Sequence, residues 1–89
     1  MYRFYILRCS DNSLYCGMTS NLEKRIKEHN SHGSKGAKYL RAKKPVILAY
    51  SETYPDIKTA MNREFQIRKW TKAKKEALIN GGLDLSKKL

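Results

Sequence analysis

The stretch SLYCGMTSNLEKRIKEHN, residues 13–30, changes from a β-like run to a charged helical pattern at Ser20. Ser20 and Glu23 have the spacing of a capping box, which predicts that a helix starts at Ser20. The helical pattern continues to about Asn30, where a polar, glycine-containing segment follows. The sequence therefore predicts a strand that leads directly into a helix at Ser20.

The predicted helix has an inward stripe defined by Leu22 and Ile26. At 100° per residue, His29 lies about 20° and Arg25 about 60° from Leu22. Two bland interpretations are a hydrogen-bonded core histidine and an arginine that extends from the edge of the stripe into water. The functional alternative is that this helix directs ionisable groups toward a site on the sheet.

Upstream, residues 2–9 (YRFYILRC) and 14–19 (LYCGMT) are rich in aromatic and aliphatic residues and predict a β-hairpin. A two-residue turn would put Tyr5 and Tyr15 on opposite faces of the sheet. A three-residue turn with Asn12 in the left-handed conformation shifts the pairing by one residue and puts both tyrosines on the same face. Because asparagine tolerates that conformation, the three-residue turn is favoured.

Downstream, residues 34–44 form a basic connector with one predicted helical turn, and the near-continuous apolar run 46–54 predicts a central strand. Asp56 is a predicted N-cap for a helix from Ile57 to about Trp70, and Thr71 for a last helix ending at Asn80-Gly81-Gly82. The order β-β-α-β-α-α predicts an α+β domain, a small antiparallel sheet covered by helices. With only 89 residues, we expect one domain over 1–82 and a frayed tail over 83–89.

The chain carries 19 Lys+Arg against 8 Asp+Glu, a net charge of +11 that indicates a polyanionic partner, nucleic acid first. The alternative is that the charge serves only solubility. No segment approaches the roughly 20 apolar residues that span a bilayer, and the first residues lack signal-peptide features, so a cytoplasmic protein with no membrane partner is expected. Cys9 and Cys16 have no zinc-ligand spacing and are expected to be free thiols.

The helix predicted over 57–70 places Glu64 near the centre of its apolar arc, about 20° from the direction of Ile57. The other members of the arc are Ala60, Met61, Phe65 and Ile67. An ionised carboxylate in such a setting needs a counter-charge, a metal or a proton. One interpretation is an internal ion pair with Arg68, one turn later; the other is a functional carboxylate.

Four features together resemble the GIY-YIG endonuclease domain, in particular its small stand-alone bacterial members. They are RFY at 3–5, YCG at 15–17 followed by Thr19, the NLEKRIKEH helix, and a glutamate on the helix after the third strand. The resemblance covers roughly residues 2–80. It implies a three-stranded antiparallel sheet flanked by helices and an activity that hydrolyses DNA phosphodiesters.

The resemblance also implies roles for individual residues. Tyr5 and Tyr15 match the two motif tyrosines, and Gly17 and Thr19 belong to the second motif, where the glycine allows close approach of backbone or substrate. Arg25 and His29 match the helix arginine and an imidazole found in many members. Glu64 matches the sole protein ligand of one divalent cation, Mg²⁺ or Mn²⁺, both of which keep bound water.

The chain departs from the family pattern in several places. Arg3-Phe4 replaces Gly-Ile of the first motif, and Cys16 replaces Ile of the second. Met18 stands where some members have lysine, and Glu76 where others have a substrate-positioning asparagine. These last two departures bear on the efficiency of catalysis more than on the fold.

In the expected mechanism, Arg25 contacts phosphoryl oxygens, for which its planar guanidinium is suited. Tyr5, Tyr15 and His29 are candidates for the base that activates water; Tyr5 is expected to act as base and Tyr15 to orient water or phosphate. A basic patch is expected to neutralise backbone phosphates near the site, formed by Lys35, Lys38, Arg41, Lys43, Lys44 and Lys69. Structured or damaged DNA, or targeting by a partner protein, is expected in place of recognition of a long sequence.

Two other functions remain open on sequence grounds. A non-catalytic nucleic-acid-binding module that keeps the nuclease fold would pair Glu64 with Arg68 and hold no metal. A small RNA-binding protein would stack bases on exposed aromatic residues such as Tyr39. Metal dependence separates the nuclease from both alternatives.

Overall fold

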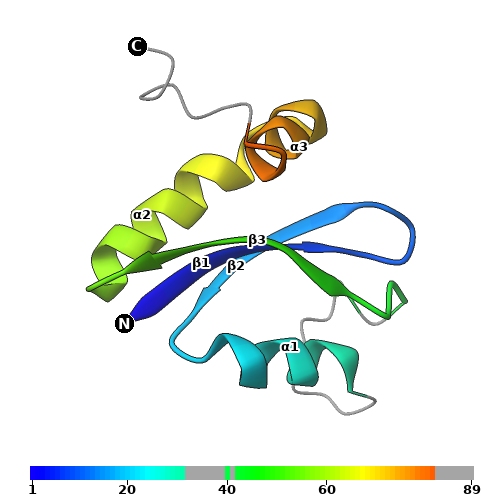
Figure 1. Ribbon diagram of the computed structural model, residues 1–89, viewed down its shortest axis with the longest axis horizontal. Coiled ribbons are helices and arrows are strands. Elements are labelled where there is room, and N and C mark those ends of the chain that lie inside the picture. Colours follow the sequence, from blue (N-terminus) through cyan, green and yellow to red (C-terminus); the bar gives the residue numbers. More distant parts are fainter. Residues whose placement is uncertain (32–39, 41, 82–89) are drawn as a thin grey trace.

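The computed structural model describes residues 1–31, 40 and 42–81 and contains a three-stranded antiparallel sheet in the order β2-β1-β3. One helix, α1, covers one face of the sheet, and α2 and α3 lie on the other (Figure 1). The elements are β1 Tyr2–Arg8, β2 Leu14–Thr19, α1 Leu22–Asn30, β3 Ile47–Tyr54, α2 Ile57–Arg68 and α3 Lys72–Ile79. The predicted α+β class, element order and antiparallel sheet are confirmed. Most of the connector 34–44 and the tail 83–89 lie outside the described residues.

The hairpin between β1 and β2 has the predicted three-residue turn. Asn12 adopts a φ of 69°, and the backbone N–H groups of Cys9 and Asn12 donate to the carbonyls of Ser13 and Cys9, each at 2.9 Å. The resulting register pairs Tyr5 with Gly17 and Leu7 with Tyr15. Residues two apart on a strand share a face, so Tyr5 and Tyr15 lie on the same face, the one covered by α1.

The central strand is β1, and its residues alternate between two hydrophobic cores. Phe4 and Ile6 pack with Ile67 of α2 on one face, whereas Tyr5 and Leu7 pack beside α1 on the other. The prediction that residues 46–54 form the central strand is therefore wrong, because β3 is an edge strand. Its apolar run misled the prediction: Ile47 and Leu48 keep 61% and 42% of their surface exposed.

The N-cap of α1 is Asn21, and the predicted capping box at Ser20 is wrong. The Asn21 side chain accepts a hydrogen bond from the backbone N–H of Lys24, at 3.2 Å. Thr19 fixes this corner, since its hydroxyl oxygen accepts from the Asn21 N–H and its hydroxyl donates to the Asn21 carbonyl. This turn places Asn21 at the N-cap. A capping box then requires a glutamate or glutamine at position 24, whereas Glu23 is only two residues after the cap.

Helix α2 begins after the predicted cap Asp56 but ends at Arg68, two residues before the predicted end. Its buried side is narrow, with Ala60 and Ile67 both fully buried. The other three members of the predicted apolar arc, Ile57, Met61 and Phe65, are 46–53% exposed, so the arc was placed too far around the helix. The true buried stripe is centred on small and branched residues, and Glu64 stands at its margin.

A polar clasp, formed by Glu52, Tyr50, Tyr54 and Arg63, fastens α2 to β3. Glu52 accepts hydrogen bonds from both tyrosine hydroxyls and from Arg63 Nε and Nη2 at 2.8 and 2.9 Å. Four donors satisfy both carboxylate oxygens, so this half-buried group is structural. By holding Arg63, the clasp fixes the rotation of α2 about its axis and with it the direction of the next residue, Glu64.

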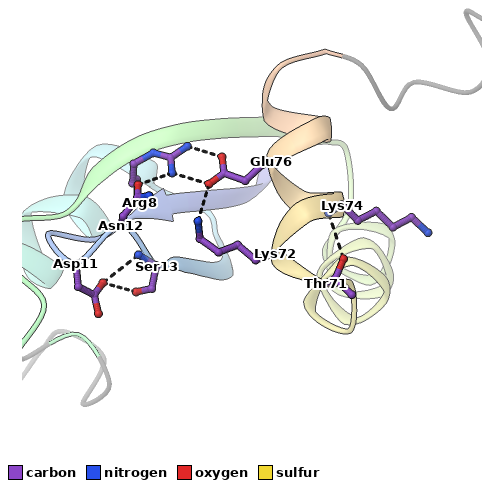
Figure 2. Close-up of polar contacts among 8 residues, drawn as sticks. All are labelled: Arg8, Asp11, Asn12, Ser13, Thr71, Lys72, Lys74 and Glu76. Carbon is purple, nitrogen blue, oxygen red and sulfur yellow. Dashed lines mark hydrogen bonds and ion pairs between the residues drawn. The ribbon is translucent and has the colours of Figure 1, made fainter.

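A second ionic contact fastens α3 to the hairpin (Figure 2). Arg8 donates from both Nη atoms to Glu76, at 2.7 and 2.6 Å, and also to the Asn12 side chain. Lys72 approaches the same carboxylate at 3.1 Å. The residue at the position of the family's substrate-positioning asparagine is thus engaged in holding α3. As predicted, Thr71 caps this helix and Gly81, with a φ of 77°, follows its end.

Candidate active site

The site starts from a buried pair formed by Tyr5 of β1 and His29 of α1. The Tyr5 hydroxyl lies 3.1 Å from His29 Nε2, and His29 has no exposed surface. Burial is the main reason that the pKa of His29 falls to about 4, with the nearby Arg25 charge acting in the same direction. His29 is therefore neutral at pH 7.

Arg25 lies next to both Tyr5 and His29. Its guanidinium forms an ion pair with Glu28 at 3.0 Å and also donates a hydrogen bond to the Tyr5 hydroxyl. Because a guanidinium can only donate, the Tyr5 oxygen accepts from Arg25, and the 3.1 Å contact with His29 Nε2 is a second hydrogen bond of the same hydroxyl. Burial and the neighbouring Tyr15 raise the pKa of Tyr5 to about 12, although Arg25 opposes the rise.

Tyr15 of β2 stands next to the same imidazole. Its ring centroid lies 5.5 Å from that of His29 in an edge-to-face arrangement. Tyr15 is half buried, and burial raises the pKa of its phenol, whereas the Arg25 charge lowers it. The four predicted residues of the hairpin and first helix are therefore brought together on one face of the sheet.

Gly17 provides the space that the Tyr5 phenol occupies. A Cβ at Gly17 would lie 2.5 Å from the Tyr5 hydroxyl oxygen and 2.7 Å from Cζ of the same ring. Neither distance is possible without displacing the phenol. The glycine thus permits the close approach of the Tyr5 ring, a candidate active-site side chain, and its motif neighbour Thr19 holds the turn into α1.

Glu64 belongs to α2, which lies on the face of the sheet opposite to α1 (Figure 1). Its carboxylate nevertheless acts on this site: its charge contributes to raising the pKa of both Tyr5 and Tyr15. Helix α2, which carries Glu64, packs against both β1 and β2, the strands that carry the two phenols. The predicted ion pair with Arg68 is present, at 3.4 Å.

An open groove of about 340 Å³ lies beside Arg25. It is lined by Thr19, Ser20, Asn21, Lys24, Arg25 and Glu28. The helical pattern assigns Lys24 to the outward face of the helix, and its place in the groove was missed. The polar residues Ser20 and Asn21 at the start of the helix, which also line the groove, are the sequence signal that could have predicted it.

The comparison with protein families agrees with this geometry. The GIY-YIG catalytic domain model matches residues 1–77, most of the chain. The chain belongs to the GIY-YIG family. The resemblance drawn from the two tyrosine motifs, the arginine helix and the glutamate is thereby confirmed.

Relatives of this GIY-YIG chain are small proteins. A UPF0213 protein of Bacillus pumilus is 47% identical over 85% of this chain and 76% of its own length, and one of Haloquadratum walsbyi is 42% identical over 92% and 90%. The solution NMR structure of a UPF0213 protein from Bacillus halodurans is 38% identical, with a TM-score of 0.57, covering 90% of this chain and 84% of that one. The shared fold extends over nearly the whole of each protein.

The GIY-YIG family implies a nuclease-type activity, a nucleic-acid substrate and a divalent metal. Among residues 1–31, 40 and 42–81, no group of three His, Cys, Asp or Glu side chains is placed to hold a metal ion. A single carboxylate still fits Mg²⁺ or Mn²⁺, which complete their coordination with water and phosphate oxygens. Glu64 suits this, because its side chain keeps 17% of its surface exposed and its Arg68 partner is 59% exposed and displaceable.

The predicted basic patch of this GIY-YIG domain is only partly described. Lys35, Lys38 and Arg41 lie outside the described residues. Lys43 forms an ion pair with Asp11 at 2.6 Å, and Lys44 donates to the Ser31 carbonyl, so both ammonium groups already have partners within the fold. Lys69 is exposed, with its ammonium 3.9 Å from the centroid of the Phe65 ring.

Two further sequence expectations concern thiols and membranes. Cys9 and Cys16 are both buried and both free, as predicted. In the part of the chain that the structure describes, no helix has the length and apolar character to cross a membrane.

The buried histidine predicts a pH-dependent stability. The pKa of His29 is about 4 in the folded protein and 6.5 in the unfolded chain, so only the unfolded chain takes up a proton between these values. We expect the free energy of unfolding to be constant above pH 6.5 and to fall by on the order of 3 kcal/mol as the pH drops to 4. Urea titrations at several pH values measure this.

The matched variant is His29→Gln, which should remove the loss between pH 6.5 and 5. The carboxylates act at lower pH: hydrogen bonds from Arg8 and Lys72 lower the pKa of Glu76 to about 2, so its contribution is lost below about pH 4.5. An equal slope in wild type and variant above pH 5 would show that His29 is not the group responsible.

Proposed function

We propose that the protein is an endonuclease that hydrolyses DNA phosphodiester bonds with one divalent cation, Mg²⁺ or Mn²⁺. The observation that carries this proposal is the convergence of Tyr5, Tyr15, Arg25 and His29 on one face, with the Glu64 charge also acting on both phenols. A cation, an imidazole, two phenols and a carboxylate are the groups that a phosphodiester hydrolase uses.

In this proposal Arg25 binds the phosphoryl oxygens and Tyr5 is the base. As water attacks phosphorus, its proton passes to the Tyr5 oxygen, and the Tyr5 proton passes to His29 Nε2 along the 3.1 Å contact. With a pKa near 12 for Tyr5 and near 4 for His29, neither group alone is matched to neutral pH. Arg25 stabilises negative charge that develops on the phenol oxygen, and Tyr15 orients the water or the phosphate.

Glu64 would hold the divalent cation, which when bound supplies charge stabilisation for the phosphate and its leaving oxygen. The Arg68 guanidinium neutralises Glu64 in the structure, through a weak and largely exposed contact. A substrate phosphate offers Arg68 a better partner, for which its planar fork is suited. Arrival of substrate would therefore release the carboxylate.

Nucleic acid is the proposed partner of the cationic surface, which includes Lys24, Lys69 and the predicted connector cations Lys35, Lys38 and Arg41. Such contacts carry charge and little sequence information, so affinity should fall steeply with salt. We propose structured or damaged DNA as the substrate, with targeting by a partner protein and action in the cytoplasm. The proposed domain extends over residues 1–82.

One observation favours a second candidate, a nucleic-acid-binding module without catalysis. The 3.4 Å contact between Glu64 and Arg68 is the internal pair that such a module would keep. It leaves the Tyr5–His29–Arg25 arrangement without a purpose, since a binding module needs no phenol hydrogen-bonded to a buried neutral imidazole. The endonuclease accounts for both features.

The test is nicking of supercoiled plasmid and branched DNA with Mg²⁺ or Mn²⁺, comparing wild type with Tyr5→Phe and His29→Gln. Tyr5→Phe keeps the ring in the core and removes the base, so we expect a loss of about 10²- to 10⁴-fold in rate. His29→Gln still accepts the Tyr5 hydrogen bond but takes no proton, and a smaller loss is expected.

The result that would reverse the assignment is abolished nicking in His29→Gln with retained nicking in Tyr5→Phe. Absence of nicking by the wild-type protein with either metal, together with tight DNA binding, would establish the non-catalytic module. Circular dichroism of each variant confirms that the fold is intact.

A further inference from the structure

Three apolar side chains form an exposed strip on α2 that neither core uses. Ile57, Met61 and Phe65 follow one another at intervals of four residues and are 46%, 52% and 53% exposed. Over eight residues a helix rises about 12 Å, so the strip is a continuous row along the helix. The row lies beside Glu64 and away from the fully buried Ala60 and Ile67.

The Phe65 end of the strip is surrounded by positive charge. The Lys69 ammonium stands 3.9 Å from the ring centroid, and the Arg68 guanidinium 5.7 Å from it. Both cations are solvent-exposed, so neither needs the ring to be satisfied. An exposed aromatic ring flanked by cations on long side chains is the arrangement with which proteins stack nucleobases and neutralise the attached phosphates.

We propose that Phe65 is a stacking platform for an unpaired base, which makes DNA with an unpaired nucleotide next to the cleaved phosphate the preferred substrate class. The inference rests on the proposed nuclease function and deepens it. Phe65 follows Glu64 directly, and Arg68 contacts both the Glu64 carboxylate and the Phe65 ring. A base on Phe65 therefore brings its own phosphate to the cations beside the proposed metal ligand.

The relative strengths of the contacts favour this exchange. An exposed cation over a ring contributes a factor of about 2 to 5 in an equilibrium constant. Stacking of a base on an aromatic side chain contributes a factor of about 5 to 150. A base that displaces Lys69 thus gains more than is lost, and the released ammonium is free to pair with a phosphate.

Charge identifies nucleic acid as the occupant in preference to a second copy of this chain. Each copy carries a net charge of +11, so pairing of two copies through a strip flanked by Lys69 and Arg68 is opposed by charge repulsion, whereas a nucleic acid is attracted. Fully paired DNA has its bases stacked inside the helix and offers the ring nothing to stack on. Only an unpaired nucleotide satisfies both the ring and the cations.

The experiment compares affinity for two fluorescein-labelled DNAs, a fully paired duplex and the same duplex with a single-stranded flap, by fluorescence anisotropy with EDTA present. Phe65→Ala is expected to weaken flap binding by about 5- to 150-fold and duplex binding by less than about 2-fold. Phe65→Trp should keep the wild-type affinity for the flap. The matched control is Ile47→Ala, which removes a comparably exposed apolar side chain on the edge strand β3.

The inference is overturned if Phe65→Ala weakens both DNAs equally or neither, or if Phe65→Leu binds the flap as well as wild type. Sedimentation showing a wild-type dimer that Phe65→Ala dissociates would assign the strip to a second copy instead. Because no metal is present, a Phe65-dependent flap preference stands even if plasmid nicking fails. If the protein nicks DNA but shows no Phe65-dependent preference for the flap, the proposed nuclease function stands and the proposed stacking role of Phe65 is rejected.

Discussion

Glu64→Gln is expected to reduce plasmid nicking with Mg²⁺ or Mn²⁺ by about 10³-fold or more. The amide keeps the size of the side chain but has no charge to hold a divalent cation. A bound metal supplies several kcal/mol of transition-state stabilisation in phosphoryl chemistry, and each 1.36 kcal/mol is a factor of ten in rate. Nicking rates measured over a metal titration give the effect.

This loss should occur without unfolding. The contact between Glu64 and Arg68 is 3.4 Å long and largely exposed on the arginine side, so its removal should change the free energy of unfolding by less than about 1 kcal/mol. The matched control is Glu23→Gln, which removes an exposed carboxylate from the first turn of α1 and should leave nicking unchanged. Equal rates for Glu64→Gln and wild type would exclude Glu64 as the metal ligand.

Gly17→Ala is expected to lower the rate of plasmid nicking by about 10²-fold, although alanine is the smallest possible addition. The new Cβ would lie 2.5 Å from the Tyr5 hydroxyl oxygen, so the phenol must move away from His29 and Arg25. A displacement of about 1 Å of a catalytic group can lower a rate by about 10²-fold. Overpacking of the core around Tyr5 should also lower the free energy of unfolding by about 1–3 kcal/mol.

Gly81→Ala provides the control for a glycine substitution. Gly81 has a φ of 77°, and a Cβ added there would meet nothing within 4 Å, so alanine strains the backbone without touching the site. We expect a similar, modest loss of stability with unchanged nicking. If Gly17→Ala kept full activity, the observed position of Tyr5 would not be the one that catalysis requires.

Local chemistry was sufficient to predict the hairpin and therefore the shared face of the two phenols. Asn12 is one of the few residue types that tolerates a positive φ, and a one-residue change in turn length reverses every side chain of β2. The caps Asp56 and Thr71 were predicted for the same reason, since a side chain bonds to backbone three residues away. At the start of α1, Ser20 and Asn21 were both possible N-caps, and the hydrogen bonds between Thr19 and the Asn21 backbone make Asn21 the observed cap.

The position of Glu64 relative to the core could not be predicted in the same way. A helical wheel counts Met61 and Phe65 as core because they are apolar, whereas the helix turns Ala60 and Ile67 inward. That rotation is held by Arg63 binding Glu52, a residue of another element eleven positions away. Such a contact has no local sequence pattern that could have predicted it.

The alternation of β1 between two cores links folding and chemistry at a single position. Phe4 and Ile6 support α2, while the intervening Tyr5 belongs to the opposite core and to the proposed proton path. Because the Tyr5 ring fills part of the core beside Leu7 and Leu22, phenylalanine is the substitution at position 5 that preserves this packing. Under the proposed mechanism the hydroxyl alone distinguishes the two residues, so a screen for foldability would accept both tyrosine and phenylalanine, and only a screen for nicking would separate them.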